Sequence, residues 1–190
     1  MGKDEVVDLV DGRDRKVGEA TLEKCLSEGL LHRAVAVLVA RSDGRFLIQV
    51  RSRKDHWQPG RWTLSCTGHV RAGEGYAHAA RRELAEELGL SPAVTQLAKV
   101  FLPKIRSRGS VEWEVVSLYS AMSDEPPRVD PVELEGVRVV TRAELDALMG
   151  GRRLTPDAKM MIAEYWRANR GRPSSRPSRR APRRPAPASR

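Results

Sequence analysis

The segment from residue 68 to residue 90 constrains this chain more than any other part of its sequence. Its first eight residues hold three glycines, so we predict a loop over residues 68–75. Beyond the loop, apolar side chains recur every fourth residue, which predicts a helix with one buried face. They are Tyr76, Ala80, Leu84 and Leu88. Gly89 follows the last of them, where a left-handed residue commonly ends a helix.

The same helix carries three glutamates close together. Glu83 and Glu87 are four residues apart and share one face, and Glu86 borders that face. Like charges repel at this spacing, and the negative end of the helix dipole disfavours them further. A solvated acidic face supported by Arg81 and Arg82 is one explanation. The other is a bound divalent cation such as Mg²⁺, which takes carboxylate oxygens and is completed by substrate phosphates.

The spacing of the whole segment distinguishes these explanations. It fits Gly-x5-Glu-x7-Arg-Glu-aliphatic-x-Glu-Glu-x-Gly-aliphatic at all seven fixed letters and both aliphatic places. At typical residue usage this agreement arises by chance about once in 10¹⁰ starting points. The pattern is the Nudix box, and the chain resembles the Nudix hydrolase superfamily over roughly residues 5–168. The resemblance implies an α/β/α sandwich with a mixed sheet, and hydrolysis of a diphosphate linkage with Mg²⁺ or Mn²⁺.

The resemblance also implies a role for each residue of the box. Three glutamates would be metal ligands, one of them assisting the attacking water: Glu83, Glu86 and Glu87. Arg82 would hold these carboxylates through a salt bridge. Gly68 and Gly89 would shape the two flanking loops, and Glu74 would support the loop before the helix.

The residues around the box resemble the isopentenyl-diphosphate isomerase branch of Nudix proteins. In that branch three histidines and two glutamates hold a metal, and four of these positions match here: His32, His69, Glu112 and Glu114. The remaining histidine position falls at Cys25. Taken without the flanking motifs, the histidines read as ordinary strand-end residues. The two glutamates then read as the exposed face of an alternating strand.

Three departures from the isomerases favour hydrolysis. The isomerases use a Cys directly before the Gly-His pair, whereas this chain has Thr67 there and Cys66 one residue earlier, facing the opposite side of a strand. They use a Trp near the C-terminus, and its matching place close to Arg152 lacks an aromatic residue. They also have Arg at the position of Glu83. We therefore expect a metal-dependent diphosphate hydrolase, with isopentenyl-diphosphate isomerase as the alternative.

Strands and helices alternate along the rest of the chain, which predicts an α/β protein with a mixed sheet between helical layers. We expect strands at 4–10, 34–40, 46–50, 62–67, 97–102, 111–122 and 137–140, with residues 34–50 forming a hairpin. We expect further helices at 19–28, from 142 onward and from 155 to about 169. Three basic residues flank the loop before the box and are candidates to hold substrate phosphates: Arg51, Lys54 and Arg61.

The positive charge is concentrated at the C-terminus. Residues 171–190 hold seven Arg, five Pro, four Ser and no acid, whereas the whole chain has a formal net charge of +9. Residues 1–170 are therefore nearly neutral and form the expected Nudix domain, followed by a disordered basic tail. The tail could contact nucleic acid phosphates, which gives a third hypothesis, an RNA-binding or polyanion-binding protein on a Nudix scaffold. A merely solvating terminus is the simpler explanation.

Composition disfavours other classes of protein. The longest uniform apolar run, residues 34–40, has seven residues, and a membrane helix needs about 20. The first residues contain no apolar stretch of the signal-peptide kind. Two cysteines are too few for a disulfide or zinc framework. We expect a cytoplasmic protein with a small-molecule diphosphate as its partner, and the sequence leaves the oligomeric state open.

Overall fold

The computed structural model describes residues 4–54, 57–129 and 134–170. Its strands are β1 (Val6–Val10), β2 (Lys16–Thr21), β3 (His32–Ala40), β4 (Phe46–Arg51), β5 (Trp62–Thr63), β6 (Cys66–His69), β7 (Val94–Phe101), β8 (Ile105–Ser107), β9 (Ser110–Glu112), β10 (Glu114–Met122) and β11 (Leu134–Val140). Its helices are α1 (Leu22–Glu28), α2 (Tyr76–Leu88), α3 (Arg142–Gly150) and α4 (Pro156–Ala168). The tail from residue 171 to residue 190 lies outside the described residues.

The central strand of the main sheet is β3. It pairs in parallel with β10 along its whole length and antiparallel with β6 over residues 34–37. β10 pairs antiparallel with β7, and β4 pairs antiparallel with β11, so the sheet is mixed. β3 is a continuous apolar run because both of its faces are covered, as is usual for such strands.

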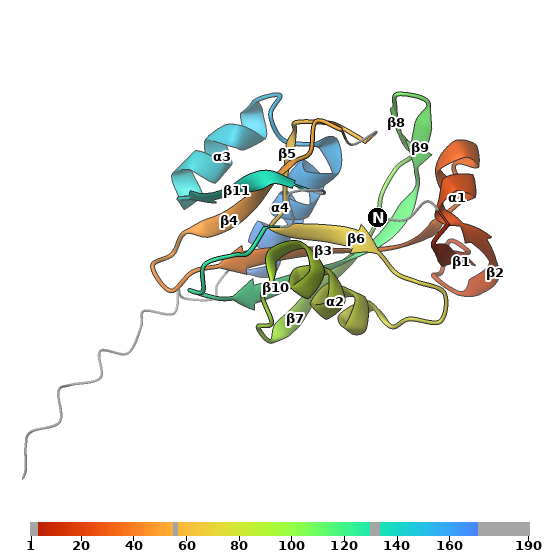
Figure 1. Cartoon of the computed structure of the whole chain (residues 1–190), viewed down its shortest axis with the longest axis horizontal. Coiled ribbons are helices and arrows are strands. Elements are labelled where there is room, and N and C mark those ends of the chain that lie inside the picture. Colours follow the sequence, from red (N-terminus) through yellow and green to blue (C-terminus); the bar gives the residue numbers. More distant parts are fainter. Residues whose placement is uncertain (1–3, 55–56, 130–133, 171–190) are drawn as a thin grey trace, which may run out of the picture.

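Alternate residues of β3 contact two different helical layers. Ala34, Ala36 and Leu38 pack in one apolar cluster with residues of α3 and α4, including Leu145 and Ile162. Val35, Val37 and Val39 pack on the other side with α2 residues that include Leu84 and Leu88. Figure 1 shows the same arrangement, with α2 on one side of the sheet and α3 and α4 on the other. The α/β/α sandwich with a mixed sheet is therefore confirmed.

The predicted helix ends are also present. α2 ends at Leu88, and Gly89 adopts φ +62°, in the left-handed region that favours glycine. Thr141 and Glu144 form a capping box at the start of α3. No helix in the described part of the chain combines the length and the apolar character that a membrane crossing requires.

Several predicted elements differ from the structure. Residues 16–21 form β2 along the edge of β1, and α1 begins only after Thr21, whose side chain caps it. The strand predicted at 62–67 is divided into β5 and β6, and β6 continues to His69, inside the predicted loop. In the predicted hairpin, β3 and β4 pair only at Ala40 and Phe46, because β6 takes the place beside β3. In each case, pairing with another strand determined the structure that the segment adopts.

The strand predicted at 111–122 is interrupted at Trp113. Residues before it belong to β9, which forms a separate two-stranded ribbon with β8, and residues after it belong to β10 in the main sheet. Figure 1 shows the ribbon extending away from the sheet, next to α1. Glu112 and Glu114 therefore belong to different sheets, and Glu114 is only 7% exposed, so the interpretation of the two glutamates as an exposed strand face was wrong.

Candidate metal centre and active-site cavity

Arg82 connects the loop before α2 to the carboxylates on that helix. Its guanidinium donates hydrogen bonds to Glu74 at 2.9 and 3.0 Å, to Glu83 at 2.7 Å and to Glu86 at 3.1 Å. A further bond of 2.9 Å reaches the backbone oxygen of His69 at the end of β6. One side chain thus fixes the loop, the helix and the neighbouring strand relative to one another.

Glu74 is the loop residue that receives most of these bonds. Its carboxylate also accepts from the backbone N–H of Arg71 at 3.0 Å and lies 2.6 Å from the ring of His78. Burial opposes its ionisation, but the hydrogen bonds from Arg82 and His78 outweigh burial and hold the pKa of Glu74 at about 2. Glu74 is therefore an ionised anchor of the loop, as expected for a residue that supports its shape.

The three glutamates of α2 differ in their surroundings. Glu83 and Glu87 are each only 3% exposed, whereas Glu86 is exposed. Burial raises the pKa of Glu83 to about 7, against the opposing effect of Arg82. A Cβ atom added to Gly68 would lie 2.1 Å from Glu83 Cδ, so the glycine makes room for this carboxylate. Two buried acids on one helix face form a site for positive charge.

A second group of ligands lies on three neighbouring strands. His32 begins β3, His69 ends β6 and Glu114 begins β10, and one ligand atom from each lies within 4.8 Å of the others. Glu114 Oε1 is 3.2 Å from His69 Nε2 and 3.6 Å from His32 Nε2. The strand register explains the meeting, because Glu114 pairs directly with His32 and His69 pairs with Ala34.

The ring of His32 has the hydrogen-bonding pattern of a metal ligand. Its Nδ1 is 2.9 Å from the backbone oxygen of Leu30, so Nδ1–H donates there and Nε2 keeps its lone pair. Nε2 is buried and makes no hydrogen bond within the described residues. Burial and the neighbouring His69 lower the pKa of His32, which keeps the ring neutral. The donor set of two imidazoles and a carboxylate fits a divalent cation, and imidazole suits Zn²⁺ better than Mg²⁺.

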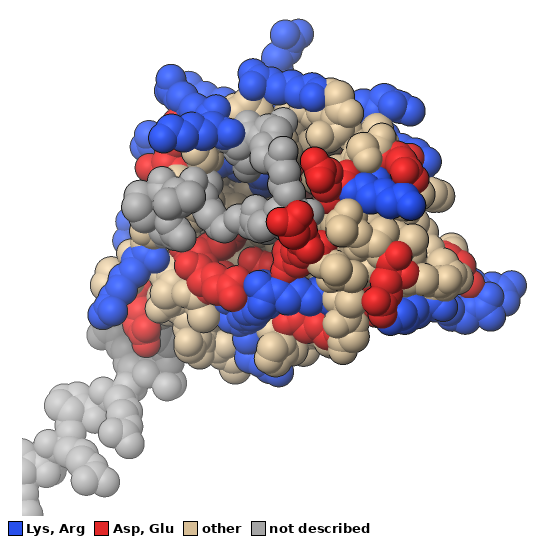
Figure 2. All heavy atoms as spheres, turned by 45° about the vertical axis from the view of Figure 1, so that its right-hand side comes forward, with Lys and Arg blue, Asp and Glu red and all other residues tan. Residues whose placement is uncertain are grey.

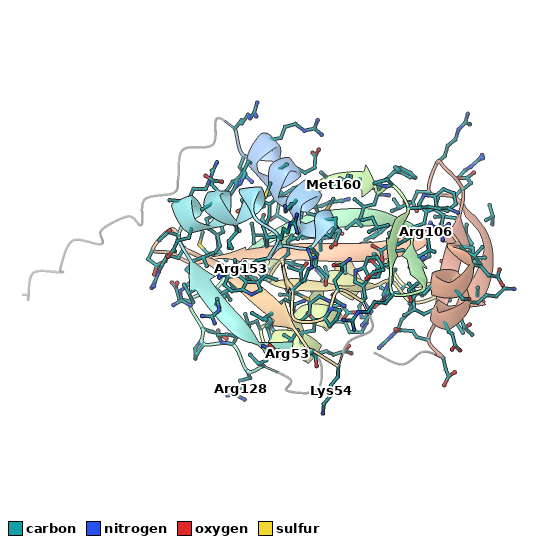
Figure 3. The ribbon with its side chains drawn as sticks, turned by 90° about the horizontal axis from the view of Figure 1, so that it is seen from above. Arg53, Lys54, Arg106, Arg128, Arg153 and Met160 are labelled. Carbon is teal, nitrogen blue, oxygen red and sulfur yellow. The ribbon has the colours of Figure 1, made fainter. Side chains whose placement is uncertain are left out.

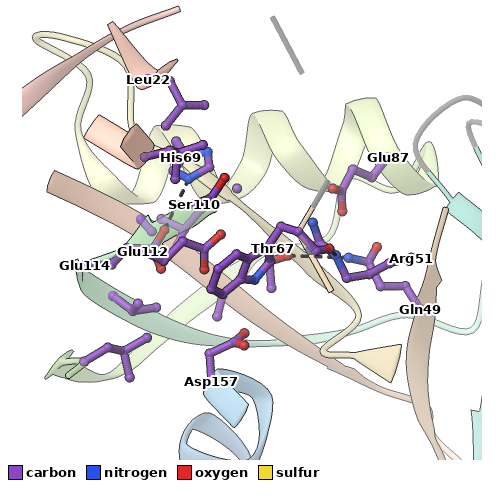
Figure 4. A pocket seen from close by; sticks show the side chains of 18 of the residues that line it. Leu22, Gln49, Arg51, Thr67, His69, Glu87, Ser110, Glu112, Glu114 and Asp157 are labelled. Atoms are coloured by element: carbon purple, nitrogen blue, oxygen red, sulfur yellow. Dashed lines mark hydrogen bonds and ion pairs between the residues drawn. The ribbon is translucent and has the colours of Figure 1, made fainter. Parts of the chain in front are cut away.

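Of these three candidate ligands, His69 and Glu114 line a cavity of about 520 Å³, whereas His32 is not in its lining. One wall is apolar and includes Leu102, Val116 and Met161. The acidic residues in the lining are Glu23, Glu87, Glu112, Glu114 and Asp157, and the basic ones are Arg51 and Lys54. In Figure 4, Glu87 from α2 and Asp157 from α4 approach the cavity from opposite sides. On the face seen in Figure 2, acidic side chains gather near the middle, and Lys and Arg stand mostly around its edge. Such a basic rim attracts phosphate anions.

The sequence-predicted site residues are distributed unevenly around the cavity. His69, Glu87, Glu112 and Glu114 line it, whereas Glu83 and Glu86 do not. Glu112 is in the lining but not in the ligand group of His32, His69 and Glu114. Cys25 is also outside that group, and burial raises the pKa of its thiol to about 11, so it is a neutral core residue.

Two of the three basic residues predicted to hold phosphates are in the lining. Arg51 lies inside, donating from Nε to the backbone oxygen of Trp57 at 3.0 Å, and Lys54 is at the outer end. Lys54 extends outward beside Arg53 in Figure 3, and Arg53 pairs with Glu135 at 2.9 Å. Arg61 is not in the lining: it donates to the backbone oxygens of Arg152 and Leu154 at 2.8 and 3.4 Å and anchors the segment before α4.

The strand β6 turns Cys66 away from the cavity. Cys66 is fully buried in the apolar cluster beneath α2, whereas Thr67 lines the cavity and accepts a 3.5 Å hydrogen bond from Gln49. The Cys66 thiol and the Thr67 side chain therefore face opposite sides of the strand, as predicted from the sequence. Arg152, close to the position that lacks an aromatic residue, is exposed and is not in the cavity lining.

Sequence reasoning assigned no role to Asp157, which lines the cavity. Asp157 is in the first turn of α4, where an acid usually complements the helix dipole, so its sequence position gave no signal of a site. Trp57 is only 5% exposed and contributes a wall of the cavity. From the sequence, Trp57 could stack on a base or pack in the core.

The comparisons with known proteins agree with this architecture. The family profile described as the NUDIX domain matches residues 30–160. A crystal structure of a Deinococcus radiodurans protein superimposes with a TM-score of 0.70 at 27% identity, covering 84% of this chain and 98% of that one. Fold, carboxylate helix and profile together define the class, and the chain belongs to the Nudix family.

Its relatives carry two different names. An isopentenyl-diphosphate Delta-isomerase of Serratia proteamaculans is 35% identical over 130 residues, which covers 68% of this chain and 73% of that protein. An uncharacterized Nudix hydrolase of Pseudomonas aeruginosa is 34% identical over 163 residues, which covers 85% and 93%. The choice between isomerisation and hydrolysis therefore rests on this chain's own residues.

Proposed function

We propose that this protein is a divalent-metal-dependent hydrolase that cleaves the diphosphate linkage of a small organic molecule. The observation that supports it most is the complete carboxylate set of α2, with Glu83 and Glu87 buried and Arg82 bonded to Glu83 and Glu86. The isomerases that this chain resembles have Arg in place of Glu83. A helix with all three acids offers a cation site that a helix with Arg there lacks.

Each residue of this site has a role that its position supports. Glu83, Glu86 and Glu87 would hold Mg²⁺ or Mn²⁺, and His32, His69 and Glu114 offer a second cation position. A divalent cation at these carboxylates neutralises diphosphate charge and lowers the pKa of a bound water. Glu87 lines the cavity whereas Glu83 and Glu86 do not, which supports Glu87 as the group that would accept the proton of the attacking water.

The substrate phosphates would lie between these acids and the basic side of the cavity. Arg51 is held by its bond to the Trp57 backbone, which orients its guanidinium before a substrate arrives. Lys54 at the outer end adds a positive charge. Glu112 stays a candidate ligand on the opposite side. The predicted contact of the basic tail with nucleic acid falls outside the described residues and stays a prediction.

The second candidate function is isopentenyl-diphosphate isomerisation. Its support is the 35% identity to a protein of that name and the cluster of His32, His69 and Glu114. The residues that line the cavity are evidence against isomerisation. Isomerisation needs one proton added and another removed at carbon, and Thr67 offers only an unactivated hydroxyl where the isomerases present a thiol. The thiol of Cys66 is sealed in the core.

One experiment separates the two reactions. The full chain is incubated with nucleoside diphosphate sugars, dinucleoside polyphosphates and prenyl diphosphates, with Mg²⁺ and separately with Mn²⁺, and products are followed by ³¹P and ¹H NMR. Hydrolysis releases a monophosphate or inorganic phosphate, whereas isomerisation conserves the diphosphate and moves a double bond. Glu87→Gln should abolish the phosphate release. Conversion of isopentenyl diphosphate to its allylic isomer, without phosphate release from any compound, would refute the proposal.

A further inference from the structure

Asp157 is an acidic residue of the cavity to which neither the Nudix box nor the ligand cluster assigns a role. It belongs to the first turn of α4, after the cap formed by Thr155, which accepts from the backbone N–H of Ala158 at 3.3 Å. Met161, four residues later and on the same helix face, also lines the cavity. Figure 4 shows Asp157 pointing from α4 into the cavity.

The start of α4 is held firmly against the sheet. The backbone N–H of Trp62 in β5 donates to the oxygen of Arg153 at 2.9 Å, and the backbone N–H of Thr155 donates to the oxygen of Trp62 at 2.9 Å. Because these bonds fix Arg153 and Thr155, just before the helix, the backbone that carries Asp157 is held beside the cavity. Its position is a built feature of the fold.

The carboxyl group of Asp157 is left without a full set of partners. Its Oδ1 is buried and makes no hydrogen bond within the described residues. Burial raises the pKa of Asp157, and the charge of Glu114 raises it further. A buried polar atom that lacks a partner destabilises the folded protein, and such atoms are retained where a ligand completes them.

The chemistry of the cavity limits which ligand group can form a hydrogen bond with Asp157 Oδ1. A phosphate oxygen is an acceptor and would be repelled, and the phosphates have Arg51 and Lys54 in the same cavity. Asp157 does not belong to the metal-ligand group formed by His32, His69 and Glu114. The remaining partner is an N–H or O–H donor on the organic part of the ligand, with the apolar wall of Leu102 and Met161 beside it.

We propose that Asp157 determines substrate specificity by accepting a hydrogen bond from a hydroxyl or amino group of the substrate's organic moiety. The description of the ligand as a substrate rests on the proposed diphosphate hydrolysis. The preference for a ligand that carries a hydrogen-bond donor rests on the cavity alone. The substrate class is therefore a diphosphate of a hydroxylated or aminated compound, such as a sugar or nucleoside. A hydrocarbon chain would leave Oδ1 unpaired, and sites built around such a bond reject analogues that lack the donor.

The test compares two ligands that differ in their hydroxyl groups. Ribose 5-phosphate and pentyl phosphate each carry one phosphate on five carbons, and their dissociation constants are measured by calorimetry on the full chain with Mg²⁺. The wild-type protein should prefer ribose 5-phosphate by about tenfold or more. Asp157→Leu should remove this preference. Asp157→Asn, which keeps the shape and one acceptor oxygen, should retain part of it.

A matched control and a stability measurement exclude a merely structural role. Asp146→Asn removes an exposed carboxylate of α3 that pairs with Arg142 at 2.7 Å, and it should leave the ligand preference unchanged. Replacing Asp157 by Asn or Leu should leave the melting temperature unchanged or raise it, because a poorly paired buried acid is removed. If Asp157 were retained for structural stability, its replacement would lower the melting temperature.

The outcomes separate this inference from the proposed function. If the wild-type protein and Asp157→Leu show the same ratio of the two dissociation constants, the specificity role is refuted, whether or not the protein hydrolyses diphosphates. If the ratio changes as stated but no diphosphate in the panel is cleaved, the proposed function fails and the binding role of Asp157 stands. A large loss of melting temperature in Asp157→Asn with an unchanged ratio would also refute the role.

Discussion

Replacing Gly68 by alanine is the sharpest test of how this active site is packed. The new Cβ would lie 2.1 Å from Cδ, 2.3 Å from Oε1 and 2.6 Å from Cγ of Glu83. No real Cβ tolerates such contacts, and the obstacle is a side chain held by its 2.7 Å bond to Arg82. Either β6 separates from α2, or Glu83 leaves its position.

Both responses have a cost that can be estimated. Forcing a methyl group into a packed interior costs about 1–3 kcal/mol. Moving Glu83 instead gives up a hydrogen bond to a charged group, worth about 1.5–3 kcal/mol. In a protein of this size each kcal/mol lowers the melting temperature by about 2–4 °C, so Gly68→Ala should lower it by about 2–12 °C. Hydrolysis should fall by about tenfold or more, because the metal-binding carboxylates are displaced.

The assay is a thermal melt together with the rate of phosphate release. Gly12→Ala is the matched control, because no atom lies within 4 Å of the added Cβ there, and it should change neither quantity. In a Glu83→Ala background the obstacle is absent, so adding Gly68→Ala should cost less than about 0.5 kcal/mol. Equal destabilisation in both backgrounds would refute the steric explanation, and a wild-type melt for the single variant would refute the packing itself.

Three further predictions concern single side chains. Glu86→Gln and Glu87→Gln should each keep the fold, as measured by circular dichroism. Each should lower turnover about 10²-fold or more, because it removes the charge of a proposed metal ligand. Normal turnover in both variants would exclude the metal site on α2. Cys66→Ala should retain most activity in the phosphate-release assay, since the thiol faces the core; complete loss with an intact fold would favour isomerase chemistry. Glu74 has a pKa of about 2 in the folded protein, below its ordinary 4.5, so its contribution to stability is present above about pH 4.5 and is lost as pH falls toward 2. Denaturant melts between pH 3 and 6 should therefore show a flatter pH dependence for Glu74→Gln than for the wild type, and equal slopes would contradict the role of the Arg82 bonds.

The layers of the fold could be predicted from the sequence because their signals are local. Three signals each report on their own segment: the uniform apolar run from Ala34 to Ala40, the four-residue period of α2 and the capping box at Thr141. The misassigned parts depended on distant partners. Residues 16–21 have no strong strand pattern and become β2 only because β1 offers an edge, and Trp113 interrupts a uniform strand pattern where the chain leaves one sheet for another.

The residues of the site also divide into those indicated by local sequence and those that depend on distant partners. The resemblance to the Nudix box implied the bond from Arg82 to Glu83, whereas the bonds from Arg82 to Glu74 became visible only in the structure. The meeting of His32, His69 and Glu114 depends on three strand registers, and a resemblance to other proteins indicated it where spacing could not. Asp157 comes from the far helical layer, and only the packing of α4 on the sheet brings it to the cavity.

The choice between the two reactions depends on two small features that lie side by side in β6. Successive residues of a strand face opposite ways, so Thr67 faces the cavity and Cys66 faces the core beneath α2. The next residue, Gly68, has no side chain, and the space that it leaves is taken by Glu83. One strand thus withholds a thiol from the cavity and admits a third carboxylate beside it. The buried thiol lowers the capacity for proton transfer at carbon, and the carboxylate beside Gly68 raises the capacity to bind a cation, so two independent features of one strand favour the proposed hydrolysis.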